Sequence, residues 1–176
     1  MTEKFKKIIE YVLQAEGGIS NHKLDKGGYT RYGITYYTFK LCGEDYNGDG
    51  KIDEKDFNLL DINRAKEIYY KSFWKKINAD KINSIAISHM IFDWLVNSGN
   101  IAIKYIQALL DVEIDGVLGD ETLKAINEKD ERVLFNELYL IRKMFYYSIV
   151  FKNETQKVFL KGWLNRINKI KQLYNF

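Results

Sequence analysis

The chain contains no proline and only one cysteine among its 176 residues. Without proline, its helices must end at glycine or asparagine rather than at a proline stop. Because Cys42 is the only cysteine, an internal disulfide is excluded, and we expect its thiol to be inert. The fold therefore depends on apolar burial. An apolar content of 46% in a chain of this length suffices for one sizeable core, or for one core plus a small lobe.

Long hydrophobic runs are also missing. The most apolar stretch is interrupted by His89 and Asp93, so we expect no membrane-spanning segment. The N-terminal sequence MTEKFKKIIEYVLQ is charged and amphipathic, without the apolar core or the small-residue cleavage site of a signal peptide. We therefore expect no signal peptide in this chain and synthesis in the cytoplasm.

The net charge of the whole chain is only +3, but its distribution is uneven. Residues 131–176 hold nine Lys and Arg against three Asp and Glu. A basic lobe suits an anionic polymer, such as a cell wall or a nucleic acid. Because the stretch has no nucleic-acid-binding signature and alternates its charges with apolar positions, a solvated helix face is the simpler interpretation, and we expect no nucleic-acid partner.

The first segment has the spacing of an amphipathic helix that ends at Glu16. Its apolar positions are Phe5, Ile8, Ile9, Val12 and Leu13. Glu16 lies three residues after Leu13 and four after Val12, so it falls on the apolar face. Burial and the negative end of the helix dipole would both raise the pKa of its carboxyl group, as a general acid requires. The alternative carries equal weight: a terminal glutamate whose stem packs while its carboxylate stays in water.

Asp25 follows in a glycine-rich loop, before a short strand-like stretch at residues 29–35. Taken alone, Asp-Lys-Gly-Gly is a turn, and that is the simpler interpretation. Together with Glu16 and Thr30, however, Asp25 adds an oxygen ligand for water or sugar. A glycosidase needs one protonated carboxyl group for the leaving oxygen and a second group that activates water or attacks the anomeric carbon.

These residues carry a resemblance to glycoside hydrolase family 108, the muramidases often called secretion activator proteins. The matching motifs are EGG at 16–18, Asn21, Asp25, GGYT at 27–30, GIT at 33–35, AKEIY at 65–69, Phe73-Trp74 and FDWLVNSG at 92–99. The segment IQALLDVEIDGVLGDETLKAI at 106–126 resembles the peptidoglycan-binding region that follows the catalytic part in this family.

The resemblance implies a mainly α, lysozyme-like fold with a small β element near residues 25–35. It implies a catalytic region over 1–100 and a helical peptidoglycan-binding-like region over 101–176, which we expect to pack with the first as one compact unit. The implied activity is cleavage of the glycan strand of peptidoglycan between N-acetylmuramic acid and N-acetylglucosamine. A monomer that reaches the wall by export or by holin-type release is expected.

Residue by residue, the family match places Glu16 at the catalytic glutamate. The spacing of Glu16, Asp25 and Thr30 is also similar, within one residue, to the glutamate–aspartate–threonine set of phage-type lysozymes, which gives Asp25 and Thr30 their catalytic roles. The substrate-binding candidates are Asn21, Tyr32, Asp93 and Asn97. For Asp93, a buried, hydrogen-bonded aspartate that pins the fold is the simpler interpretation.

Residues 45–56, DYNGDGKIDEKD, are an insertion relative to this family with the pattern of an EF-hand calcium loop. The ligand positions are Asp45, Asn47, Asp49, the carbonyl of Lys51, Asp53 and Asp56. Asp56 replaces the usual glutamate, as in dockerin-type loops, and Gly50 provides the turn. The alternative is an acidic turn that caps a helix beginning near Glu54. We expect one structural Ca²⁺ and no cofactor for catalysis.

Further helices are predicted over 63–77, 83–96, 130–151 and 154–172, with Gly99 ending the second of them. The aromatic residues of the last two helices are expected in the core: Phe135, Tyr139, Phe145, Tyr146, Tyr147, Phe151, Phe159 and Trp163. Two functional classes remain open. One is a muramidase, and the other is a non-catalytic peptidoglycan-binding or calcium-dependent adaptor on a lysozyme-like fold.

Overall fold

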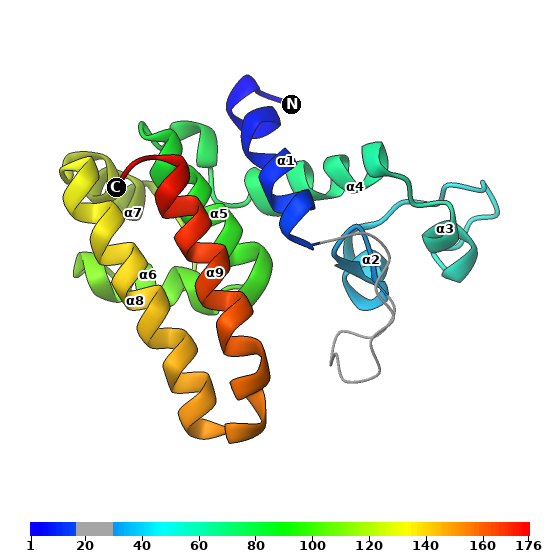
Figure 1. The fold of residues 1–176 in the computed structure, drawn as a ribbon. Helices are drawn as coiled ribbons and strands as arrows, with labels where there is room; N and C mark the ends of the chain where they lie inside the picture. Colours follow the sequence, from blue (N-terminus) through cyan, green and yellow to red (C-terminus); the bar gives the residue numbers. More distant parts are fainter. Residues whose placement is uncertain (17–29) are drawn as a thin grey trace. The chain divides into compact units, whose positions relative to one another are not determined.

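The computed structural model describes the backbone of residues 1–16 and 30–176, and the side chains of 1–14 and 30–176. The chain divides into two compact units, Met1–Lys75 and Lys76–Phe176 (Figure 1). The division expected from sequence, between residues 100 and 101, falls inside the second unit and stays a prediction. The mainly helical class with a small β element is confirmed for the described residues.

The first unit has these elements: α1 (Glu3–Glu16), β1 (Thr30–Arg31), β2 (Ile34–Thr35), α2 (Tyr36–Cys42), α3 (Glu54–Asn58), α4 (Ile62–Ile68) and a π-helix, η1 (Tyr69–Trp74). The predicted apolar face of α1 is buried at Phe5, Ile8, Ile9 and Val12. The ring of Phe5 packs edge-on against Tyr70 and Trp74, so η1 supplies one wall of this core.

The π-helix is a departure from the sequence prediction, which treats residues 63–77 as one regular helix. In the structure α4 ends at Ile68, and the N–H of Lys75 donates to the carbonyl of Tyr70 at 3.0 Å, an interval of five residues. Because a π-turn holds more residues than an α-turn, it brings Tyr69 and Trp74 toward one face, and both are buried. Apolar periodicity measured against 3.6 residues does not reveal such an insertion.

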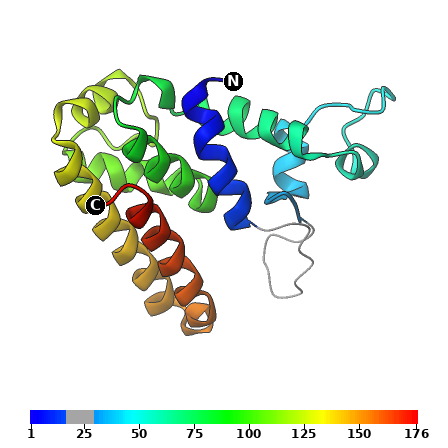
Figure 2. The same cartoon turned by 45° about the horizontal axis from the view of Figure 1, so that its top comes forward.

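The second unit has these elements: η2 (Ala79–Lys81), α5 (Ile85–Ser98), α6 (Ile101–Leu110), α7 (Asp120–Glu128), α8 (Glu131–Lys152), η3 (Glu154–Gln156) and α9 (Lys157–Leu173). Every residue of α5 from Ala86 to Leu95 is buried, because α6, α8 and α9 all pack on this helix (Figure 2). Gly99 ends α5 with a positive φ of 67°, as predicted.

The long helices α8 and α9 lie side by side and are joined by η3 (Figures 1 and 2). Their predicted ranges are confirmed within one to three residues. Their aromatic residues do not all lie in the core, however. Phe135 and Tyr146 are buried, whereas Tyr147, Phe151 and Phe159 are exposed, which corrects the expectation for these three. Helical periodicity shows that a face of a helix is apolar. When a helix has two apolar faces, periodicity does not show which of them is buried.

Candidate functional site

The catalytic candidates lie at the end of α1 and in the segment that follows it. Glu16 is the last residue of α1, in a final turn without basic residues. Its side chain, and the whole of Asn21 and Asp25, lie outside the described residues. Of the predicted catalytic set, the structure therefore describes the side chain of Thr30 alone.

Thr30 lies in a two-stranded antiparallel hairpin, in which Thr30 pairs with Thr35 and Arg31 with Ile34. The Thr30 side chain is only 8% exposed. Directly after the hairpin, the hydroxyl of Thr35 accepts the N–H of Thr38 at 3.0 Å and caps α2. This cap joins the hairpin to α2, so the position of Thr30 is set by a short and well-braced element.

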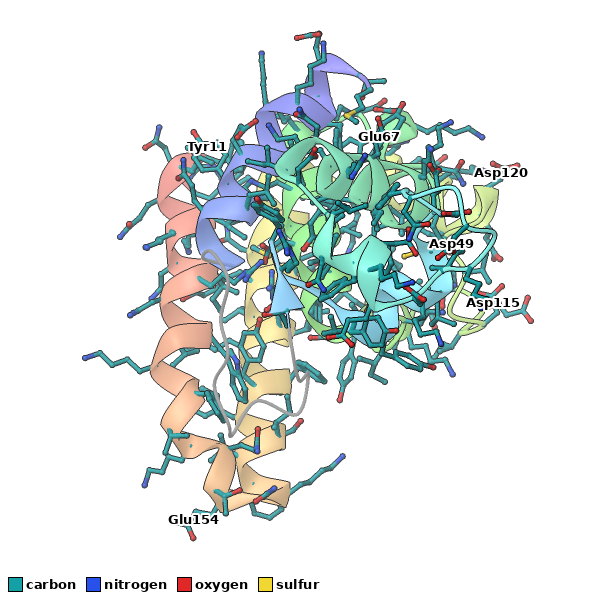
Figure 3. All side chains as sticks on the ribbon, turned by 90° about the vertical axis from the view of Figure 1, so that its right-hand side faces the viewer. Tyr11, Asp49, Glu67, Asp115, Asp120 and Glu154 are labelled. Carbon is teal, nitrogen blue, oxygen red and sulfur yellow. The ribbon has the colours of Figure 1, made fainter. Side chains whose placement is uncertain are left out.

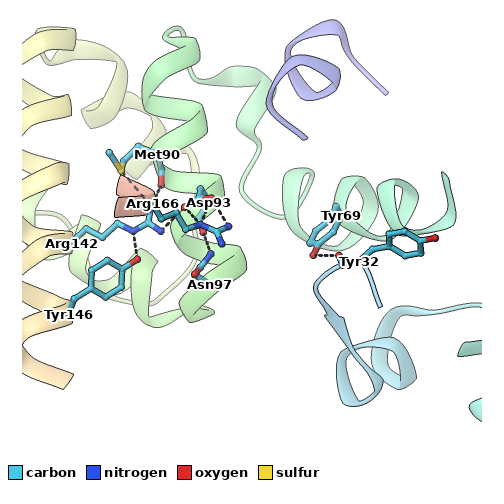
Figure 4. A network of polar contacts seen from close by, with 8 residues as sticks. All are labelled: Tyr32, Tyr69, Met90, Asp93, Asn97, Arg142, Tyr146 and Arg166. Carbon is cyan, nitrogen blue, oxygen red and sulfur yellow. Dashed lines mark hydrogen bonds and ion pairs between the residues drawn. The ribbon is translucent and has the colours of Figure 1, made fainter. Parts of the chain in front are cut away.

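The turn of this hairpin consists of Tyr32 and Gly33, which have positive φ values of 53° and 77°. Two such residues are typical of the type I′ turns that join tight hairpins, but tyrosine is rare in this conformation because its Cβ is crowded. The hydroxyl of Tyr69 donates to the carbonyl of Tyr32 at 3.0 Å (Figure 4). This bond from the buried start of η1 helps to hold the strained turn.

Tyr69 is thus a positioning residue that the sequence predictions missed. The sequence predicts that Tyr69 belongs to a helix over residues 63–77, and in the structure its ring is buried. Its hydroxyl acts on a turn 37 residues earlier in the chain. No local pattern signals such a contact.

Two other substrate-binding candidates, Asp93 and Asn97, lie one turn apart on α5 in the second unit. Asp93 is fully buried and forms ion pairs with two arginines. Its Oδ2 is 2.6 Å from Nη2 of Arg142, and its Oδ1 is 2.7 Å from Nη2 of Arg166 (Figure 4). The side-chain amide of Asn97 donates to the carbonyl of Asp93 at 3.1 Å. These contacts match the interpretation of Asp93 as a residue that pins the fold.

The charges around Asp93 determine its protonation. Burial alone would raise the pKa of this carboxyl group, but Arg166 and Arg142 hold the pKa well below its usual range. His89, one turn earlier on α5, shows the opposite balance of effects. Its burial, helped by the two arginines, lowers the pKa of the imidazole to about 4. The cluster is therefore an ionised aspartate between two guanidinium groups, beside a neutral histidine.

The predicted calcium loop, residues 45–56, folds around its own backbone N–H groups. Both carboxylate oxygens of Asp45 accept such groups, from Gly48 at 2.6 Å and from Gly50 at 2.7 Å. The side chains of Asn47 and Asp49 each accept the N–H two residues ahead. Gly48 and Gly50 have positive φ values of 79° and 81°, which allow the chain to turn twice.

The end of this loop forms a helix cap. Asp53 accepts the N–H of Lys55 at 2.8 Å and begins α3, while Asp56 accepts the N–H of Asp53 at 3.0 Å in a reciprocal capping box. The other oxygen of Asp56 accepts the N–H groups of Tyr46 and Asn47. The N–H groups of Asp53, Tyr46 and Asn47 hold the pKa of buried Asp56 below its usual value.

The predicted alternative, a turn that caps the helix beginning at Glu54, is thus present. Among the residues with described side chains, no three His, Cys, Asp or Glu residues are grouped closely enough to hold a metal ion. The predicted calcium site uses the backbone carbonyl oxygen of Lys51 and not its side chain.

The sequence predictions also do not include a polar network around Gln107 in the second unit. The buried Gln107 of α6 donates through Nε2 to Asp115 at 2.7 Å and to the carbonyl of Val117 at 2.9 Å, and its Oε1 accepts the N–H of Gly116 at 2.8 Å. One side chain therefore holds the 115–117 loop between α6 and α7 (Asp115 is labelled in Figure 3). The family resemblance covers this loop within residues 106–126, but nothing in the sequence predictions identifies Gln107 as the residue that holds it.

The comparisons with known proteins cover both parts of the chain. The family model described as "Glycosyl hydrolase 108" matches residues 9–99, and the model described as "Predicted Peptidoglycan domain" matches residues 101–168. A solved structure, "Structure of Brucella abortus SagA", is similar with a TM-score of 0.79 and 29% sequence identity, over 96% of this chain and 91% of that chain. No curated protein matches the sequence. No described helix has the length and apolar character needed to cross a membrane.

Proposed function

The chain belongs to the glycosyl hydrolase 108 family, and from this membership we propose that it is a muramidase. It would hydrolyse the bond between N-acetylmuramic acid and N-acetylglucosamine in the glycan strand of peptidoglycan. The observation that carries the proposal is the family match over residues 9–99, a range that includes both Glu16 at the end of α1 and Thr30 on β1. The peptidoglycan-domain match over residues 101–168 supports the same polymer as substrate or partner.

In the proposed reaction, Glu16 donates a proton to the leaving oxygen of the glycosidic bond. Asp25 orients or activates the attacking water, and Thr30 helps to hold it. The braced hairpin supports the role of Thr30, because a group that positions water must itself be held in place. Asn21 and Tyr32 are proposed to contact the sugar beside these residues. This proposal does not include a substrate contact for Asp93 or Asn97.

The activity test compares the wild-type protein with Glu16→Gln on purified sacculi. Glu3→Gln is the matched control, because Glu3 lies on the same helix with an exposed side chain. We expect wild type and the control to release muropeptides and Glu16→Gln to release almost none. Equal release by Glu16→Gln would refute the catalytic assignment. If none of the three proteins released muropeptides but all bound sacculi, the adaptor function would replace the muramidase.

The bond that is cleaved is identified by mass spectrometry of the glycan ends. A muramidase leaves N-acetylmuramic acid at the reducing end, whereas N-acetylglucosamine there would indicate a glucosaminidase. We further propose single displacement with inversion, in which a water molecule lies between Asp25 and the sugar. NMR of the first-formed anomer tests this, and a retained β-product would contradict it.

We also propose that residues 45–56 bind one structural Ca²⁺. The support is the set of oxygen donors at EF-hand positions and the two glycines with left-handed backbone, Gly48 and Gly50. Calorimetry with Ca²⁺ should give heat for wild type and none for the double variant Asp45→Ala/Asp49→Ala. The control Asp61→Asn changes an acidic helix cap outside the loop and should bind as wild type does. Absence of heat for wild type at millimolar Ca²⁺ would leave the loop as a capped turn only.

A further inference from the structure

One face of α8 exposes apolar side chains that the packing of the second unit does not use. Leu140, Met144, Tyr147 and Phe151 follow one another at intervals of four, three and four residues, so they lie on a single face of the helix. All four are exposed, and the side chain of Phe151 is 92% exposed. Isolated exposed apolar residues are common, but a contiguous row of them marks an interaction surface.

The row leads to the end of the α8–α9 hairpin, where η3 connects the two helices (Figures 1 and 2). Glu154 marks this end in Figure 3. Just beyond the turn, the first residues of α9 include Val158, which is 75% exposed, and Phe159, which is also exposed. We call residues 144–161 the hairpin tip. Its exposed apolar side chains come from both of the helices that this turn joins.

The hairpin tip is also strongly basic. Lys152, Lys157 and Lys161 are exposed on it, and Lys143 lies next to it. Glu154 is the only acidic residue between residues 138 and 176. The ion pairs formed among the described residues include none with any of these four lysines. The cationic groups are therefore available to an external anion.

We propose that the hairpin tip docks this protein on the surface of an anionic phospholipid bilayer. Phe151 and Val158 would enter the boundary between headgroups and acyl chains, and the lysines would face the lipid phosphates. Exposed aromatic and aliphatic side chains among lysines are the combination that binds such interfaces, since apolar burial and attraction to anionic lipid add together. The inference goes beyond the proposed function and does not depend on it.

Two other occupants fit the surface less well. A second copy of the chain, paired through the same tip, would bring two sets of lysines against each other, and like charges repel. An anionic polysaccharide would bind the lysines but would give no reason for an exposed phenylalanine. A bilayer with anionic headgroups accounts for both features.

The test is co-sedimentation of the full chain with vesicles of phosphatidylglycerol and phosphatidylcholine, compared with vesicles of phosphatidylcholine alone. We expect binding to the anionic vesicles and much weaker binding to the neutral ones. Phe151→Ala should weaken binding about tenfold, because most of a large apolar side chain is lost from the interface. The double variant Lys152→Glu/Lys157→Glu should weaken it by roughly twentyfold or more, at about fivefold for each lysine removed.

Matched controls make the same chemical change at a site outside the hairpin tip, so they show whether the position of the residue matters. Leu41→Ala removes an exposed apolar side chain of α2, and Lys7→Glu/Lys40→Glu makes the same change in net charge on the first unit. Both controls should keep at least half of the wild-type affinity. If a control weakened vesicle binding as much as its partner variant, the hairpin tip would not be the docking surface.

Intrinsic fluorescence gives a second measurement at the hairpin tip. The chain has three tryptophans, of which Trp74 and Trp94 are fully buried, while the partly exposed Trp163 stacks on Phe159. Brominated anionic lipid should therefore quench the emission of Trp163. Absence of both vesicle binding and quenching would overturn the proposal. So would equal binding to neutral vesicles, or a dimer in light scattering that Phe151→Ala abolishes. These assays contain no cell wall, so their failure would leave the muramidase proposal intact.

Discussion

Replacing Asp93 by asparagine should strongly destabilise the second unit. The carboxylate of Asp93 lies between Arg142, whose side chain is fully buried, and Arg166, whose side chain is 12% exposed. Asparagine has nearly the same size, so the substitution creates no cavity. What it removes is the negative charge that compensates two guanidinium groups, one of which has no access to water.

The magnitude follows from the cost of an uncompensated buried charge. Removal of one partner from a buried ion pair costs about 3–5 kcal/mol of unfolding free energy. Arg166 can turn part of its guanidinium toward water, but Arg142 is held by Tyr146 at 2.9 Å and cannot. For a chain of this size, about 3–5 kcal/mol corresponds to a fall in melting temperature of roughly 6–20 °C.

Differential scanning calorimetry and urea unfolding would measure this loss. Asp111→Asn is the matched control: Asp111 is exposed at the end of α6 with a positive φ of 55°, a conformation that asparagine tolerates well. We expect the control to change stability by less than about 0.5 kcal/mol. A loss below about 1 kcal/mol for Asp93→Asn would refute the account of a charge-compensated buried cluster. Wild-type muropeptide release by the folded Asp93→Asn protein would further separate this role from substrate binding.

Three further predictions concern other buried polar groups. The pKa of His89 is about 4 in the folded protein and about 6.5 when unfolded, so between pH 4 and 6.5 the protein takes up a proton when it unfolds. The contribution of His89 to the free energy of unfolding should therefore be complete above pH 6.5, and stability should fall by up to about 3 kcal/mol toward pH 4. Urea unfolding across this range checks it, and an equal slope in His89→Gln would contradict it. Tyr69→Phe should lower muropeptide release several-fold at a stability cost of about 1 kcal/mol, since it loses the bond to the carbonyl of Tyr32. Equal activity would remove Tyr69 as a positioning residue. Gln107→Leu should cost about 1–3 kcal/mol in urea unfolding, because the N–H of buried Gly116 loses its acceptor, and an unchanged midpoint would show that another group replaces it.

The sequence was sufficient for features that depend on neighbours along the chain. The apolar spacing of residues 5–13 predicts the buried face of α1, and Gly50 predicts a turn within residues 45–56. The predicted range of α8 agrees with the structure within one residue at each end, and in the structure Asp130 caps its first turn. In each case the causes lie within a few residues, so a local pattern contains them.

The sequence predictions failed where two local patterns look alike. Residues 63–77 have apolar spacing compatible with a single α-helix, yet Tyr69–Trp74 is a π-helix. Phe151 lies with Leu140, Met144 and Tyr147 on an apolar face of α8 that has the spacing of a buried face, and all four are nevertheless exposed. A pattern shows that a face is apolar, but it does not show what covers that face.

By itself, the sequence determined where α1, α5, α8 and α9 form, that Gly99 ends α5, and which glycoside hydrolase family the chain belongs to. Tertiary structure alone decided which distant groups meet. Asp93 finds Arg142 and Arg166 at separations of 49 and 73 residues, and Tyr69 reaches back 37 residues to Tyr32. The physical reason is that helical periodicity repeats every few residues, whereas charge compensation and burial depend on how whole helices pack together.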